Sequence, residues 1–238
     1  MSIIVISPKV GEESAKLLAK KLKASYENPY ETDKRDFRDY DVIFNYGFSR
    51  PIKGNTVFNK NENINKARCK ITTLSLLKDD DITVEFTQDK EEAIKWIKQH
   101  HIAVARDKAK ATQGKGLAYC YTLEDIDNLP AKFWTKYYEN THEFRINTWR
   151  DKALAVYTKK HDVKEGTFSF VKFDGVENHP QLQALVQKVY EKIGLDFSGI
   201  DVLRDEKGDL KLLEVNSAPI LPEEEVNLLV KAVKEAIV

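Results

Sequence analysis

Oxygen-bearing side chains recur with strand spacing near the end of the chain. Residues 209–216 alternate in the manner of a strand, which predicts that Glu214 and Asn216 lie on the same face as Leu210 and Leu212. Burying an ionised carboxylate without a partner costs several kcal/mol, so Glu214 must be paired with a cation, protonated or bound to a metal. The pattern therefore indicates chemistry on this face of the strand.

Asp201 adds a second carboxylate to the same place. It lies in the strand predicted for residues 199–204, which a turn joins to the strand that carries Glu214 and Asn216. Aspartate, glutamate and asparagine supply only oxygen, the ligand set suited to Mg²⁺, which usually keeps waters and bridges to substrate phosphates. These three residues are therefore predicted to hold magnesium beside a nucleoside triphosphate. The alternative is an ordinary hairpin whose acidic residues face solvent and cap a turn.

A glycine-bearing loop between two predicted strands carries Gly114, Lys115 and Gly116. Glycines let backbone N–H groups approach phosphate oxygens, and the lysine adds positive charge. The loop is not a Walker A motif, which needs the pattern GxxxxGK[ST] ahead of a helix. Taken alone, the same residues also fit a simple solvated turn.

Several cations stand at the starts and ends of predicted elements. Lys70 opens a helical pattern, Arg106 ends a strand, Arg145 lies inside a strand, and Lys159 and Lys160 end another. Arginine suits bidentate contacts to oxygen anions, and lysine suits neutralisation of a point charge. Together these residues indicate a local anion site, although each one singly also fits a surface charge.

The composition excludes several other classes of function. With 38 Lys and Arg against 38 Asp and Glu, the chain has no overall charge to attract nucleic acid or an anionic membrane. No apolar stretch is long enough to span a bilayer, no signal peptide is recognisable, and Cys69 and Cys120 lack the spacing of a disulfide framework or a zinc site. We therefore expect a cytoplasmic protein with no nucleic-acid or membrane partner.

The elements that must position these residues follow from apolar spacing. A chain of 238 residues with 42% hydrophobic residues can bury a substantial core. The predicted strands are residues 3–6, 41–46, 82–87, 102–106, 117–121, 133–138, 143–150, 153–159, 199–204 and 209–216, and the predicted helices are residues 12–24, 65–77, 90–101, 180–193 and 223–237. Changes of pattern divide the chain into an N-terminal lobe, a central lobe and a C-terminal lobe, residues 1–65, 66–135 and 136–238.

In chain order these segments resemble the ATP-grasp superfamily, and in particular the short RimK/glutathione-synthetase-like ATP-grasp proteins of tailed bacteriophages. The likeness runs from about residue 41 to residue 221. Residues 44–47 (FNYG) match a strand that runs into an Asn-aromatic-Gly turn, and residues 142–147 (HEFRIN) match an EYRVHV-like strand. Residues 194–202 (GLDFSGIDV) and 213–219 (LEVNSAP) match the paired motifs LDFGAVDV and LEVNTAP.

The resemblance implies an α/β (α+β) protein with the ATP-grasp fold, in which a small N-terminal α/β lobe precedes two α+β lobes that clasp ATP between antiparallel sheets. The implied activity is that of an ATP-dependent carboxylate–amine ligase, acting through an acyl-phosphate intermediate with Mg²⁺. One or two magnesium ions are expected, with Mn²⁺ as a substitute. The remaining partners would be an unidentified carboxylate and amine, drawn from amino acids, peptides or cell-wall precursors.

The same resemblance assigns roles to individual residues. The adenine would lie near Tyr137 and Tyr138, and the ribose near Glu143. The phosphates would be held by Lys70, Arg106, Gly114, Lys115 and Gly116, the metal by Asp201, Glu214 and Asn216, and the developing charge by Arg145 and Lys160.

Three departures from the family pattern bear on the substrate. Arg106 stands where many relatives have lysine, Ile220 replaces the glycine usual after Ala-Pro, and the chain is short for a three-lobe ligase. Two alternatives stay open, a kinase-like transfer of phosphate to a hydroxyl and a nucleotide-binding module without catalysis. The sequence also leaves open the oligomeric state, whether the cytoplasm is that of a viral host, and which of Lys159 and Lys160 faces the site.

Overall fold

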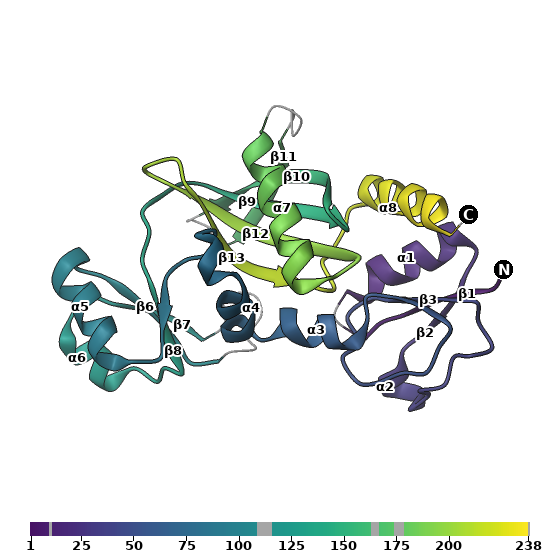
Figure 1. Ribbon diagram of the computed structural model, residues 1–238, viewed down its shortest axis with the longest axis horizontal. Coiled ribbons are helices and arrows are strands. Elements are labelled where there is room, and N and C mark those ends of the chain that lie inside the picture. Colours follow the sequence, from purple (N-terminus) through teal and green to yellow (C-terminus); the bar gives the residue numbers. More distant parts are fainter. Residues whose placement is uncertain (10, 109–115, 163–166, 174–178, 238) are drawn as a thin grey trace.

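Three β-sheets follow one another along the chain (Figure 1). The structure is a computed structural model and describes residues 1–9, 11–108, 116–162, 167–173 and 179–237. We call each sheet with its helices the N-terminal, central and C-terminal lobe. The C-terminal lobe lies between the other two in Figure 1. No helix in these described ranges is long and apolar enough to cross a membrane.

The N-terminal lobe is built on a parallel sheet with strand order β2-β1-β3-β4. Its central strands are short apolar runs that are almost wholly buried, as is usual for parallel strands covered on both faces. The elements are β1 (Ile3–Ile6), α1 (Glu12–Leu22), β2 (Ser25–Glu27), α2 (Pro29–Thr32), β3 (Val42–Asn45) and β4 (Thr56–Phe58).

The central lobe has an antiparallel sheet with strand order β5-β8-β6-β7. Alternation along β6 puts Ala103 and Ala105 against the helices of this lobe, in a cluster with Trp96 and Trp134, and leaves Arg106 on the other face. The elements are β5 (Phe86–Thr87), α5 (Lys90–His100), β6 (Ala103–Arg106), β7 (Leu117–Cys120), α6 (Leu123–Asn128) and β8 (Phe133–Lys136).

The C-terminal lobe has an antiparallel sheet with strand order β11-β10-β9-β12-β13. One face packs against α7, whose Val186 and Val189 share a buried cluster with Ile146 and Ile200. The elements are β9 (Asn140–Trp149), β10 (Lys152–Asp162), β11 (Thr167–Lys172), α7 (Pro180–Ile193), β12 (Phe197–Asp205), β13 (Leu210–Asn216) and α8 (Glu223–Ala236).

Two helices and a 3₁₀ turn connect the N-terminal sheet to the central sheet, namely α3 (Asn61–Arg68), α4 (Lys70–Leu77) and η1 (Lys78–Asp80). The single helix predicted for residues 65–77 is therefore wrong. Cys69 has extended backbone angles (φ −102°, ψ 104°), which end α3 and make Lys70 the first residue of α4. The extended segment predicted for residues 82–87 is likewise reduced to the two residues of β5.

The lobes are joined by shared apolar clusters. Phe133 of β8 and Leu203 of β12 are buried together with Leu74 of α4, which ties the central sheet to the C-terminal sheet. At the other end of the molecule, α8 packs against α1 (Figure 1), and Leu229 joins the same cluster as Leu18. The last helix of the chain therefore completes the core of the N-terminal lobe.

Gly47 marks the point where the N-terminal lobe touches the segment that follows β13. Its φ is +92°, and a Cβ atom at this position would lie 2.7 Å from the Cβ of Ala218. The neighbouring Tyr46 donates its hydroxyl to the carbonyl oxygen of Pro219 at 2.5 Å. The chain leaving β13 is thus held against the carboxyl end of β3.

We expect Gly47→Ala to lower the free energy of unfolding by about 2–5 kcal/mol, because the strained positive φ and the contact with Ala218 each add to the cost. Gly208→Ala is the matched control, since Gly208 has φ +88° but nothing within 4 Å of an added Cβ. The control should lose only about 1–2 kcal/mol. Urea unfolding measures both, and equal losses would show that the close approach to Ala218 contributes nothing.

Candidate active site

One face of the five-stranded sheet carries the charged residues singled out in the sequence. On β9, Phe144 and Ile146 belong to the core on the α7 side. Alternation therefore places Glu143 and Arg145 on the opposite face. Arg145 stands directly across from Asp201 in the register of β9 and β12. We call this surface the charged face.

Glu214 reaches the charged face because of a β-bulge. β13 pairs Glu214 with Asp201, and the register then shifts by one residue at Leu213. Leu210 and Leu212 pack into the core on the α7 side, whereas Leu213 packs into the cluster between the lobes. The prediction that Glu214 and Asn216 share a face with Leu210 and Leu212 is therefore wrong, since the extra residue turns both of them to the other face.

Two ion pairs connect the charged residues. Arg145 binds Asp201 through two donors, with Nη2 2.7 Å from Oδ2 and Nε donating to Oδ1. Lys70 Nζ lies 2.5 Å from Oε2 of Glu214, and the amide of Asn216 donates to Oε1 of Glu214 at 3.0 Å. The three predicted metal ligands and two of the predicted cations therefore form one network.

The two carboxylates of this network differ in their protonation. Burial raises the pKa of Asp201, which is 5% exposed; Arg145 opposes the rise, and the charge of Glu214 adds to it. Burial also acts to raise the pKa of Glu214, but the ammonium group of Lys70 and the amide of Asn216 bring it below its ordinary value. Negative charge is therefore held firmly on Glu214 and less firmly on Asp201.

β10 adds a lysine to the charged face. Lys159 Nζ lies 2.5 Å from Oε1 of Glu143, the residue directly across from it on β9. The side chain of Lys160, predicted to be catalytic, lies outside the described residues. The structure thus puts Lys159 beside Glu143, the residue predicted to bind the ribose.

Arg106 approaches the same network from the central lobe. It is paired across the sheet with Phe133, which is buried in the cluster between the lobes. Burial lowers the pKa of Arg106, and the nearby carboxylate of Glu214 opposes that shift. Among the described residues, its buried Nε has no hydrogen-bond partner. A buried guanidinium donor without a partner fits an anion such as a phosphate oxygen.

The predicted phosphate loop is described only at its end. Gly116 has φ +74°, and a Cβ there would collide with the carboxylate of Asp107. The Asp107 side chain could move aside, but the positive φ favours glycine at this position in the turn. Gly114 and Lys115 lie outside the described residues.

Tyr137 and Tyr138 link the central sheet to β9. Tyr138 donates its hydroxyl to Oε1 of Glu85 at 3.1 Å, and burial raises its pKa. Tyr137 is 37% exposed, and its ring meets that of Tyr119 edge to face, with centroids 6.1 Å apart. Tyr119 was missed in the sequence, although strand alternation along β7 could have placed it on the face that carries Arg106.

The donor set of the charged face fits a hard divalent cation. Asp201, Glu214 and Asn216 offer oxygen alone, and two of them are carboxylates. In the described parts of the chain no three His, Cys, Asp or Glu side chains gather into a metal-binding group. A metal here would therefore depend on the carboxamide of Asn216 beside the two carboxylates, and on oxygens of a bound substrate.

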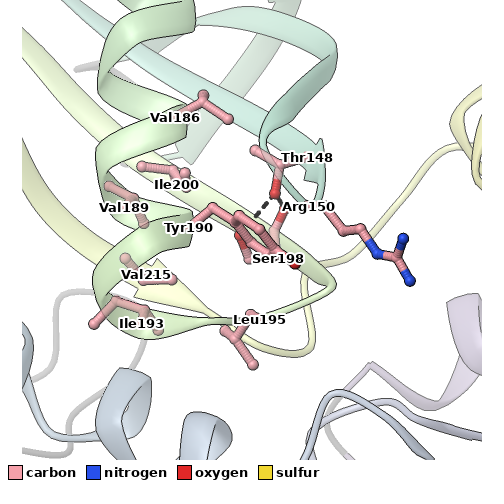
Figure 2. Close-up of a pocket in the computed structure, with 10 residues that line it drawn as sticks. All are labelled: Thr148, Arg150, Val186, Val189, Tyr190, Ile193, Leu195, Ser198, Ile200 and Val215. Carbon is pink, nitrogen blue, oxygen red and sulfur yellow. Dashed lines mark hydrogen bonds between the residues drawn. The ribbon is translucent and has the colours of Figure 1, made fainter.

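A narrow crevice on the opposite face of the sheet is not part of this site (Figure 2). It lies between α7 and the sheet, and it is too narrow to admit a water molecule. Its lining includes Val186, Val189 and Ile200, together with Thr148 and Ser198, whose hydroxyls lie 2.8 Å apart. It is an imperfection in the packing of the core.

A buried carboxylate that sequence reasoning missed lies where α8 meets the sheet. Glu225 is 3% exposed and accepts a hydrogen bond from the amide of Asn147, which is two residues from Arg145 on β9. The hydroxyl of Tyr157 donates to the adjacent Glu224 at 3.3 Å. Burial raises the pKa of Glu225, and the Tyr157 hydroxyl, which is also close to Glu225, and the amide of Asn147 oppose the rise. In the sequence, the three glutamates that open this helix gave no sign of which one is buried.

Glu225→Gln is expected to flatten the pH dependence of stability. A raised pKa in the folded state means that the contribution of Glu225 is present below its ordinary pKa of 4.5 and is lost as the pH rises through the raised value. The wild type should therefore lose free energy of unfolding, relative to Glu225→Gln, from pH 4.5 upward. Urea unfolding at several pH values measures the difference.

Glu223→Gln serves as the matched control on the same helical turn. Lys21 lowers the pKa of Glu223. The stability that Glu223 contributes is therefore present at higher pH and is lost as the pH falls. The two variants should thus shift stability in opposite directions with pH. If the stability of the two variants changed with pH in the same direction, the raised pKa of a buried Glu225 would be contradicted.

Comparison with known proteins identifies the fold. No family model matches the sequence, and no curated protein matches it. Among solved structures, the ATP-grasp ligase PsnB with a minimal precursor has a TM-score of 0.74 at 11% identity, covering 99% of this chain and 99% of PsnB. PsnB has also been solved with Mg and ADP, and with its precursor peptide and AMPPNP.

Two further structures are similar over nearly their whole length. The D-alanyl-alanine synthetase A of Vibrio cholerae has a TM-score of 0.71 at 12% identity, covering 99% of this chain and 98% of the synthetase. The RimK domain ATP-grasp protein of Sphaerobacter thermophilus has a TM-score of 0.71 at 11% identity, covering 98% and 99%. The chain therefore has the ATP-grasp fold, and the predicted α/β (α+β) fold class is confirmed.

Proposed function

We propose that this protein is an ATP-dependent ligase that joins a carboxylate to an amine, with Mg²⁺ bound by Asp201, Glu214 and Asn216. The observation that carries the proposal is the network in which these three residues meet Lys70 and Arg145 on one face of a sheet. The ATP-grasp fold supports it, since the similar protein PsnB is named as a ligase and one of its structures contains Mg and ADP.

In this proposal ATP lies between the central and C-terminal sheets. Tyr137 and Tyr138 adjoin the adenine, and Glu143 adjoins the ribose. Arg106 offers a phosphate oxygen its buried Nε, which has no hydrogen-bond partner among the described residues, and Lys70 adds a second positive charge. The loop with Gly114, Lys115 and Gly116 completes the phosphate site.

The chemistry follows from positioning and charge. A bound magnesium ion would neutralise phosphate charge. The substrate carboxylate would attack the γ-phosphate of ATP, and an amine would then displace phosphate from the acyl-phosphate. Arg145 stabilises the charge that develops on the reacting oxygens, together with a lysine of β10, either the predicted Lys160 or Lys159. Fixed charges that need no reorganisation during the reaction usually account for much of the rate enhancement in such sites.

The identities of the substrates belong to the same proposal. Amino acids, peptides and cell-wall precursors supply the carboxylate and amine that the chemistry needs. A bacteriophage relationship is a further part of the proposal and rests on the sequence motifs in residues 194–202 and 213–219. A cytoplasmic setting rests on Cys69 and Cys120, which lack the spacing of a disulfide framework.

The test is ADP release by the purified protein with ATP and magnesium, in the presence of pooled amino acids, peptides or peptidoglycan precursors. Substrate-stimulated ADP release with an amide product in mass spectra is the expected result. A phosphorylated product without an amide would instead establish a kinase-like transfer. Absence of ATP binding in calorimetry, with magnesium present, would overturn the proposal.

A further inference from the structure

A group of arginine and hydroxyl side chains lies at the carboxyl end of the N-terminal sheet. Ser49 and Arg50 follow β3, Tyr30 belongs to α2, and Arg68 is the last residue of α3. In open α/β sheets, ligands bind outside the carboxyl ends of the strands. The proposed ligation chemistry leaves this group without a role.

The contacts within the group hold both guanidinium groups in place. Arg68 Nη1 donates to Oγ of Ser49, which lies 3.3 Å from the hydroxyl of Tyr30. The guanidinium carbon of Arg50 lies 4.9 Å from the centroid of the Tyr30 ring, and that ring packs against Phe48 at 4.7 Å. Stacking on a ring leaves the in-plane N–H donors of arginine available to an anion.

The two arginines and the tyrosine of the group are exposed, and no carboxylate in the described part of the chain neutralises the arginines. Both arginines are exposed, and Tyr30 is 42% exposed. Within the described ranges neither Arg50 nor Arg68 forms an ion pair, unlike Arg35 and Arg38 of the same lobe, which pair with Asp33 and Asp36. Two neighbouring guanidinium groups without carboxylate partners form a local anion site.

Two short chain segments connect this group to the charged face. Arg68 stands two residues before Lys70, whose Nζ contacts Glu214. On the other side, Gly47 packs against Ala218, two residues after Asn216. Two residues of extended chain span only about 7 Å. A ligand a few residues long can therefore reach from the metal ligands to the arginines.

We propose that Arg50 and Arg68, with the hydroxyls of Ser49 and Tyr30, bind a second carboxylate of the substrate. This rests on the proposed function and deepens it, because it makes the substrate an acidic peptide. One carboxylate of the peptide attacks the γ-phosphate of ATP beside Glu214 and Asn216, which releases ADP, and another carboxylate is held by the arginines. Neighbouring Asp or Glu side chains of one short peptide would supply the two carboxylates.

The test is calorimetric binding of tri-glutamate and tri-glutamine to the full chain, with magnesium and AMPPNP present. Tri-glutamate should bind, and tri-glutamine should bind at least tenfold more weakly. Arg50→Gln and Arg68→Gln should each weaken tri-glutamate binding about 10- to 100-fold, as expected for loss of a charge-assisted contact. The control Arg38→Gln, which removes an exposed arginine paired with Asp36, should leave it unchanged.

Equal affinity for the two peptides, or tri-glutamate binding that neither arginine variant weakens, would overturn the proposal. Urea unfolding of each variant distinguishes a structural role of the arginines from a role in peptide binding. A purely structural contact between Arg68 and Ser49 would change stability and leave peptide affinity unaltered. AMPPNP binding is measured in the same proteins. Its absence would defeat the ligase proposal, while the comparison of tri-glutamate with tri-glutamine still decides whether the arginines bind carboxylates.

Discussion

Glu214→Gln is expected to lower the rate of ATP turnover by about 100- to 1,000-fold while the protein stays folded. Glutamine keeps an oxygen that accepts a hydrogen bond from Lys70, which contacts Glu214 at 2.5 Å. It removes the negative charge, however, and a neutral amide is a weaker ligand for a hard divalent cation. The measurement is steady-state ADP release as a function of magnesium concentration.

Glu92→Gln is the matched control for this experiment. Glu92 is also a carboxylate paired with a lysine, Lys95 at 2.9 Å, but it lies on the surface of α5. Its replacement should leave turnover unchanged. Turnover at the wild-type rate in Glu214→Gln would show that Glu214 holds no metal needed for the reaction.

Arg145→Met is expected to reduce the free energy of unfolding by about 3–5 kcal/mol, because it leaves the buried carboxylate of Asp201 without its partner. Asp201 is only 5% exposed, and the side chain of Arg145 is 19% exposed. Without the guanidinium the pKa of Asp201 should rise further, since burial already raises it. Protonation then relieves the buried charge, so the loss should be larger at pH 8 than at pH 5.

The double variant Arg145→Met/Asp201→Leu distinguishes the energy of the Arg145–Asp201 pair from the effects of each substitution on its other neighbours. Replacing both members of a buried ion pair with apolar groups is often close to neutral, so most of the stability lost in Arg145→Met should return. Urea unfolding of the two single variants and the double variant gives the coupling energy. Losses that simply add would contradict a direct pairing of Arg145 with Asp201.

Regular alternation and helical spacing were enough to predict much of the fold. The helix over residues 180–193 was predicted with its observed bounds, because its apolar residues keep one period from end to end. The strand at residues 3–6 was predicted equally well, as a continuous apolar run. By contrast β2, β4 and α2 are three or four residues long, too short for any period to be recognised.

The bulge at Leu213 shows why the site could be predicted in composition but not in geometry. Alternation alone puts Glu214 on the face of Leu212, since a strict period of two does not reveal the extra residue of a bulge. The partners of the carboxylates also come from distant parts of the chain, such as Lys70 for Glu214. The contact of Tyr46 with Pro219 and the packing of α8 on α1 depend on tertiary structure and leave no local signal.

The ion pairs of the charged face have a consequence for the order in which ligands enter. Arg145 and Lys70 already neutralise Asp201 and Glu214, so a free magnesium ion would have to displace a guanidinium and an ammonium group. Under the proposed function, the phosphates of ATP give both cations another anion to bind and release the carboxylates to the metal. Metal and nucleotide would then enter together as one complex, and each would strengthen the binding of the other.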